Sequence, residues 1–185
     1  MLEHVLSEDW ENGGFGVYIH WPFCAAKCPY CDFNSHVRNN IDQKQWLKSY
    51  LSEINRVSKN TSNRSLNSVF FGGGTPSLIE PWVINDILNE IQKYWKTKDI
   101  FEVTLEANPG SVDAKNFEAY RSAGVNRVSM GIQSLNEKDL KALGRTHTVK
   151  EALSAFEIAQ QNFPAVSFDL IYARQNQNLM QWEKE

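Results

Sequence analysis

Short runs of apolar residues alternate along the chain with longer segments in which apolar residues recur every three or four positions. A short apolar run bounded by turn residues is typical of a buried strand, and the wider spacing is typical of an amphipathic helix. The pattern predicts five strands, at residues 16–21, 68–71, 100–105, 125–132 and 166–172. Helices are predicted between successive strands and again from residue 176, and residues 60–67 are predicted to form a polar loop.

Several helix ends are marked by capping residues. Asp42 is a predicted N-cap with Gln45 at the reciprocal position, Pro81 suits the first turn of a helix, Gly124 suits a helix end, and residues 148–151 form a capping box. Strands that alternate with helices favour an α/β fold with a parallel sheet and right-handed crossovers. In such folds the loops at the carboxyl ends of the strands carry the functional site.

The composition fits a single globular domain. The chain has 185 residues, of which 42% are hydrophobic, and a net charge of -3, so no general affinity for nucleic acid is expected. No stretch approaches the ~20 apolar residues of a membrane span. Residues 1–14 are acidic and lack an apolar run, so we expect an N-terminal extension and not a secretory signal, followed by one core domain over residues 15–185.

All three cysteines lie in one short loop after the first predicted strand. Cys24, Cys28 and Cys31 are spaced C-x3-C-x2-C, and so short a loop with an odd thiol disfavours disulfides. Clustered unpaired thiols indicate a reducing compartment such as the cytoplasm. A zinc ion would need a fourth ligand, for which His20 or His36 is available. An iron-sulfur cluster held by three cysteines would instead leave one iron free for another ligand.

Other loops at predicted strand ends carry residues suited to binding. Gly73 and Gly74 follow the second strand, and glycine there lets backbone approach a ligand closely. Glu106 follows the third strand, and its carboxylate suits the hydroxyl groups of a ribose, as in dinucleotide sites. Gln133 follows the fourth strand. We expect these loops and the cysteine loop to converge on one mouth.

Five motifs in order carry a family resemblance. Residues 18–23, Tyr-Ile-His-Trp-Pro-Phe, followed by C-x3-C-x2-C, resemble the radical S-adenosylmethionine (SAM) superfamily. Four further motifs resemble the branch containing oxygen-independent coproporphyrinogen III oxidase and the haem chaperone HemW: residues 71–77, 106–109, 127–134 and 143–147. The motif that the resemblance implies for the oxidases is C-x3-C-x2-C-x-C, with a fourth cysteine two residues after the third. In this chain Phe33 stands at the position of that fourth cysteine. The resemblance therefore favours the haem chaperone type.

The resemblance implies a fold and a set of cofactors. The fold would be an incomplete parallel (β/α) radical SAM barrel, in which Cys24, Cys28 and Cys31 hold a [4Fe-4S] cluster and the open iron binds SAM. It implies haem or a porphyrin precursor as a further ligand, with a haem-accepting protein or a dimer partner. The implied cofactor-binding residues are Tyr18, Tyr30, Gly73, Gly74, Thr75, Glu106, Gln133, Arg145 and Asp169.

The chain departs from the family pattern in two places. Residues 173–177, Ala-Arg-Gln-Asn-Gln, replace a turn that usually contains glycine and proline, so a strained or reshaped turn is expected. Family members are longer, so we expect the last barrel unit and a C-terminal domain to be missing and the fifth strand to be an uncovered edge. Two alternatives remain: an enzyme that decarboxylates coproporphyrinogen III, and an inactive truncated remnant.

Overall fold

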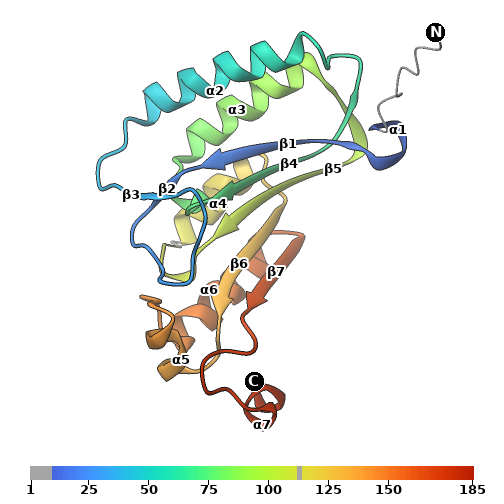
Figure 1. Cartoon of the computed structure of the whole chain (residues 1–185). Helices are drawn as coiled ribbons and strands as arrows, with labels where there is room; N and C mark the ends of the chain where they lie inside the picture. Colours follow the sequence, from blue (N-terminus) through green and yellow to red (C-terminus); the bar gives the residue numbers. More distant parts are fainter. Residues whose placement is uncertain (1–9, 112–113) are drawn as a thin grey trace, which may run out of the picture.

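The computed structural model describes residues 10–111 and 114–185. Most of the expected N-terminal extension lies outside these residues, and the described part contains one helical turn, α1 (Trp10–Gly13). Five strands form a parallel sheet in the order β1-β4-β5-β6-β7 (Figure 1). Their bounds are β1 Phe15–Trp21, β4 Ser65–Gly73, β5 Lys96–Ala107, β6 Arg127–Gln133 and β7 Ala165–Leu170. The predicted parallel α/β sheet is confirmed.

Helices connect the strands as predicted. Figure 1 shows α2 (Gln43–Ser58) and α3 (Pro81–Tyr94) side by side along the sheet. The remaining helices are α4 Ala114–Ser122, α5 Glu137–Ala142, α6 Val149–Asn162 and α7 Leu179–Lys184. Two 3-10 turns, η1 (Pro76–Leu78) and η2 (Pro109–Ser111), and a two-residue pairing of β2 (Phe23–Cys24) with β3 (His36–Val37) were not predicted.

The predicted helix caps are largely confirmed. Asp42 Oδ1 accepts a hydrogen bond of 3.0 Å from the Gln45 backbone N–H, and Pro81 occupies the first turn of α3. Thr148 and Glu151 form both hydrogen bonds of the capping box that opens α6. These local signals fix where the helices begin, and therefore where the preceding strand-end loops stop.

The strands have one buried and one open face. In β6, Val128, Met130 and Ile132 are buried with the helices, whereas the side chains between them are partly exposed. Because side chains alternate along a strand, the helices cover only one face of the sheet. The uncovered face is polar around Arg127, which donates to Thr104 Oγ1 (3.2 Å) and to Ser167 Oγ (2.9 Å) on the flanking strands.

Several predicted boundaries were wrong. β4 begins at Ser65 and β5 at Lys96, so part of the expected polar loop is strand. The early residues pair in register, Ser65 with Lys96, but their polar side chains concealed the strands. β6 and β7 begin and end within two residues of the prediction, and α7 begins at Leu179, three residues later than expected.

The expected reshaping of the turn after β7 is confirmed. Ala173 and Asn176 have positive φ values of 55° and 62°, a backbone region that residues other than glycine rarely adopt. The turn leads into a segment that folds back on α5, where Arg174 pairs with Asp139 at 3.0 Å. β7 pairs only with β6 among the described residues, which agrees with the expected open edge.

Tyr120 of α4 supports the loop that follows β4. Its hydroxyl is buried and lies 2.7 Å from the Ser77 carbonyl O and 2.8 Å from the Ile79 carbonyl O. Tyr120→Phe should lower the free energy of unfolding by about 1–2 kcal/mol, because buried carbonyls lose a donor. Urea denaturation measures this, with Tyr94→Phe as control. The Tyr94 hydroxyl accepts a hydrogen bond from the exposed Asn55 Nδ2 and donates to Glu90 Oε1, so its loss leaves no buried carbonyl without a donor. Equal losses in both variants would contradict the supporting role.

Candidate cofactor site

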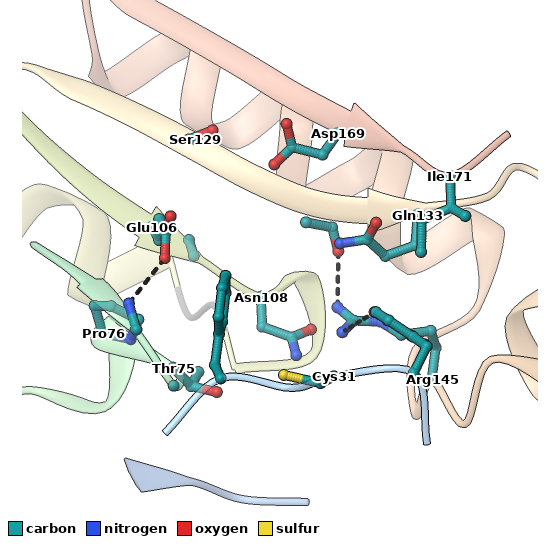
Figure 2. Close-up of a pocket in the computed structure, with 16 residues that line it drawn as sticks. Cys31, Thr75, Pro76, Glu106, Asn108, Ser129, Gln133, Arg145, Asp169 and Ile171 are labelled. Atoms are coloured by element: carbon teal, nitrogen blue, oxygen red, sulfur yellow. Dashed lines mark hydrogen bonds between the residues drawn. The ribbon is translucent and has the colours of Figure 1, made fainter. Parts of the chain in front are cut away.

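A pocket of about 370 Å³ opens at the carboxyl ends of the strands. Its volume lies within the roughly 300–1,000 Å³ of typical small-molecule sites. Figure 2 shows Ser129 and Asp169 along one side and Cys31 and Arg145 on the opposite side. The pocket is lined by Tyr30, Cys31, Phe33, Gly73, Gly74, Thr75, Pro76, Glu106, Ala107, Asn108, Ser129, Gly131, Gln133, Arg145, Asp169 and Ile171.

Most of the residues expected to bind a cofactor line this pocket, and the strand-end loops converge as expected. Tyr18 does not line it: it lies on the open face of β1, 57% exposed and stacked on Phe70 with ring centroids 5.9 Å apart. Of the three cysteines, Cys31 lines the pocket, whereas Cys24 and Cys28 do not. The sequence interpretation missed Ser129 and Asn108. Ser129 was detectable from the alternation in β6, and Asn108 belongs to a motif whose individual role was not assigned.

The cysteine loop is held at its base by hydrogen bonds. The His36 N–H donates to the Pro22 carbonyl O (2.7 Å), and Lys27 Nζ donates to the Phe33 carbonyl O (3.1 Å). His20, named above as an available zinc ligand, is half-buried, and its Nε2 lies 2.9 Å from the Asn34 carbonyl O. Its strand alternates sides, so His20 faces the cysteine loop instead of the helices.

The three cysteines are unpaired and differ in exposure. Cys24 is buried, whereas Cys28 and Cys31 are partly exposed. Among the residues that the structure describes, no three His, Cys, Asp or Glu side chains lie close enough together to hold one metal ion. Three thiols in one loop beside the pocket are a donor set that fits an iron-sulfur cluster, in which each thiolate binds a different iron.

The glycine loop, residues 72–74 at the end of β4, packs against the base of the cysteine loop. Gly73 has a φ of 112°, and a Cβ added at Gly74 would lie 2.5 Å from the Phe23 carbonyl O and 3.0 Å from Cys24 Sγ. The Gly74 N–H also donates to the Trp21 carbonyl O at 2.7 Å. Close approach of backbone was expected toward a ligand, but the structure shows it first toward the chain itself. The two loops therefore form one unit.

Glu106 is a partly buried acid at the end of β5. Its Oε2 accepts a hydrogen bond of 3.2 Å from the Gly73 N–H. Burial raises the pKa of Glu106 above its ordinary value, and the nearby Asp169 carboxylate adds to this, while the Gly73 N–H acts in the opposite direction. The side chain is thus an acceptor held at the pocket wall at some cost to the folded state.

That cost predicts the pH dependence of stability. A carboxyl whose folded pKa is raised favours folding while protonated, and this contribution is lost as pH rises from about 4.3 through the folded pKa. Glu106→Gln should therefore make the ligand-free chain more stable at pH 7 and flatten its stability between pH 4 and 7. Urea denaturation across that range tests this. The control is Glu102→Gln, because Glu102 lies on the same strand with an exposed side chain; equal pH profiles in the two variants would refute it.

Gln133 and Arg145 form a further part of the pocket wall, beyond Gly73, Gly74 and Glu106. Gln133 ends β6 with a φ of 72°, an uncommon conformation that is frequent at functional sites. Arg145 Nη2 donates to the Gly131 carbonyl O (2.7 Å), and Nη1 lies 3.4 Å from Cys28 Sγ. Burial raises the pKa of Tyr30 to about 12, although the nearby Arg145 opposes this. The phenol is therefore neutral beside the guanidinium.

A comparison with protein-family models decides the family. The model of the radical SAM superfamily matches residues 18–184, nearly the whole chain. The chain belongs to the radical SAM superfamily. The resemblance seen in the cysteine spacing is thereby confirmed, together with the α/β fold.

Curated relatives within this radical SAM family point to one branch. The chain is 43% identical over 169 residues to the haem chaperone HemW of Haemophilus influenzae, covering 88% of this chain and 44% of the relative. It is 38% identical to a mitochondrial radical S-adenosyl methionine domain-containing protein 1 of Bos taurus, covering 91% of this chain and 38% of the relative. The chain thus spans less than half the length of these relatives.

A solved structure shows the fold. Coproporphyrinogen III oxidase (HemN) from Escherichia coli, a radical SAM enzyme, matches with a TM-score of 0.81 at 23% identity, covering 91% of this chain and 39% of that chain. The sheet is therefore part of a radical SAM barrel. Across residues 10–111 and 114–185, no helix combines the length and apolar character needed to cross a bilayer.

Proposed function

We propose that the chain is the cofactor-binding part of a HemW-like haem chaperone, which holds a [4Fe-4S] cluster and SAM. The observation that carries the proposal is one pocket whose wall includes Cys31, Glu106 and Asp169, with Cys28 contacting a further wall residue, Arg145. The similarity to HemW over 88% of the chain supports the branch. When bound, the cluster supplies one electron for the reductive cleavage of SAM.

Each residue expected to bind a cofactor has a role in this proposal. Cys24, Cys28 and Cys31 hold the cluster at the mouth, and Gly73, Gly74 and Thr75 give backbone contacts to the methionine part of SAM. Glu106 accepts hydrogen bonds from the ribose hydroxyls, as its exposed acceptor capacity allows. Gln133, Arg145 and Asp169 complete the wall, with Tyr30 beside the adenine. Tyr18 contributes from the open face of β1, where it lies outside the pocket.

The chaperone type is favoured over the oxidase type by one side chain. Phe33 lines the pocket where the oxidase pattern has a further cysteine, and it places an aromatic ring near the cofactor instead of a thiol. We propose residues 15–185 as one core domain. We propose the cytoplasm as its location, because clustered unpaired thiols are typical of a reducing compartment. Haem is the proposed cargo, delivered to an acceptor protein.

Three assays on the reconstituted chain separate this function from its rivals. We expect SAM to bind with a dissociation constant that rises at least tenfold in Glu106→Gln, and haem titration to give a saturable shift in the absorbance of haem. No carbon dioxide should be released from coproporphyrinogen III. Turnover of coproporphyrinogen III would assign the oxidase type. A chain that fails to bind SAM, or one that fails to bind haem, would overturn the proposal.

A further inference from the structure

We propose that the turn after α5 is a seat for the cysteine loop, with Gly144 and Arg145 as positioning residues for the cluster-binding thiols. The seat, residues 143–145, lies more than 110 positions from Cys28 along the chain. The inference rests on the proposed cluster site, but it concerns the chain before any cofactor is bound. It assigns Arg145 a role beyond that of a wall residue.

The first observation is the shape of the turn. Gly144 has a φ of 68°, its N–H donates to the Lys141 carbonyl O (3.1 Å), and the Arg145 N–H donates to the Leu140 carbonyl O (2.9 Å). These two bonds form a Schellman motif, which ends a helix with a left-handed residue. The motif fixes the direction in which Arg145 leaves α5.

The second observation is the contact of this turn with the loop. A Cβ added at Gly144 would lie 2.7 Å from Cδ and 3.5 Å from Cγ of Pro29. Pro29 stands between two of the three cysteines. Only glycine leaves room for the proline ring, because the neighbouring backbone is fixed by the helix end. The turn and the tip of the loop are therefore packed at contact distance.

The third observation is the bridge made by Arg145. One nitrogen of its guanidinium, Nη2, donates to the Gly131 carbonyl O at 2.7 Å, which ties it to β6. The other, Nη1, lies 3.4 Å from Cys28 Sγ and 3.5 Å from Tyr30 Oη. The planar guanidinium thus spans from the sheet to both sides of Pro29.

The seat has two physical consequences. Without it, the tip of an eleven-residue loop (25–35) would have to be ordered when the cluster binds, and ordering backbone costs about 1–2 kcal/mol per residue. A donor aimed at a ligating sulfur also stabilises the extra electron of a reduced cluster, which raises its reduction potential. Arg145 should therefore favour both cluster uptake and cluster reduction.

The test uses the full 185-residue chain with and without cofactor. The variants are Gly144→Ala, Pro29→Ala, Arg145→Met and Arg145→Lys. The control is Gly124→Ala, because Gly124 also has a positive φ of 109° but contacts Leu88 away from the loop. The first readout is the alkylation rate of each thiol by iodoacetamide in the cofactor-free chain, mapped by mass spectrometry. The second is the midpoint potential of the reconstituted cluster.

We expect Gly144→Ala and Arg145→Met to raise the alkylation rate of Cys28 several-fold, with a smaller rise in Pro29→Ala. Gly124→Ala should lower stability without changing that rate. Arg145→Met should shift the midpoint potential to more negative values, and Arg145→Lys should restore part of it. Pro29→Ala and Arg145→Met keep the test open if Gly144→Ala does not fold.

Unchanged thiol reactivity and unchanged potential in Arg145→Met, with weaker SAM binding alone, would overturn the seat and leave Arg145 as a cofactor contact only. Failure of the wild-type chain to take up iron would instead refute the proposed function. The alkylation rates of the cofactor-free variants would still decide the seat in that case. The two failures are therefore distinguishable.

Discussion

Replacing Cys31 by serine should leave a folded chain that takes up several-fold less iron than the wild-type chain. Cys31 lines the pocket and is partly exposed to solvent, so it lies outside the core. Its sulfur can therefore be replaced by the hydroxyl of serine without opening a cavity in the core. Serine is a poor cluster ligand because its hydroxyl stays protonated, whereas a cluster requires a thiolate. Anaerobic reconstitution with iron and sulfide, followed by iron and sulfide analysis per chain, measures the change.

The exposed Asp32→Asn offers a control one residue away in the same loop. It should keep the wild-type iron content. Cys24→Ser should lose iron and also stability, because Cys24 is buried against the glycine loop. Wild-type iron content in Cys31→Ser would contradict the assignment of all three cysteines as ligands.

Arg174→Met should lower the free energy of unfolding by about 3–5 kcal/mol, the usual cost of removing one partner from a buried ion pair. The side chains of Arg174 and Glu185 are each only 5% exposed. Glu185 Oε1 also accepts hydrogen bonds of 2.6 Å from Ser134 Oγ and from the Leu135 N–H. Methionine would fill the space but leave this carboxylate buried without its cation.

The effect of Arg174→Met should depend on pH. Burial alone would raise the pKa of Glu185, but hydrogen bonds from Ser134 and Arg174 hold it below its ordinary value. A depressed pKa means that this carboxylate stabilises the fold above about pH 4.3 and that the contribution is lost as pH falls through its folded pKa. The penalty of Arg174→Met should therefore be largest near pH 7 and shrink in acid.

Urea denaturation at pH 7 and pH 4 measures both effects. Arg56→Met is the matched control, because Arg56 pairs with Glu53 at the surface with 70% of its side chain exposed. Exposed pairs of this kind contribute little. If Arg174→Met cost no more than the control at pH 7, the buried network would not be what holds the segment after β7 against α5.

The order of the helices and strands could be predicted from the sequence, because buried faces require apolar residues at regular intervals along each element. Val128, Met130 and Ile132 alternate with polar neighbours, and caps such as Thr148 fix helix starts within a few residues. The early parts of β4 and β5 were missed because paired backbone there carries polar side chains, as at Ser65 and Lys96. Backbone hydrogen bonds between strands do not depend on apolar side chains, so the hydrophobic pattern of the sequence does not reveal such segments.

The site was predictable to the extent that motifs fall at strand ends. Glu106, Gln133 and Asp169 come together because parallel strands end at one edge of the sheet. The place of Tyr18 outside the pocket was not predictable, because Tyr18 shares the open face of the sheet with pocket residues such as Ser129 and only its packing on Phe70 shows where the ring lies. The contact between Gly144 and Pro29 was equally hidden, since no local pattern links a helix end to a loop so far away in sequence.

The most direct test of the cofactor site is electron paramagnetic resonance of the reduced, reconstituted chain with and without SAM. We expect about four irons per chain and the signal of a reduced [4Fe-4S] cluster. We also expect the signal to change shape when SAM is added, because in the proposed site SAM binds the iron that no cysteine holds. A chain that takes up iron but whose signal ignores SAM would contradict the account, and so would a soluble chain that takes up almost no iron.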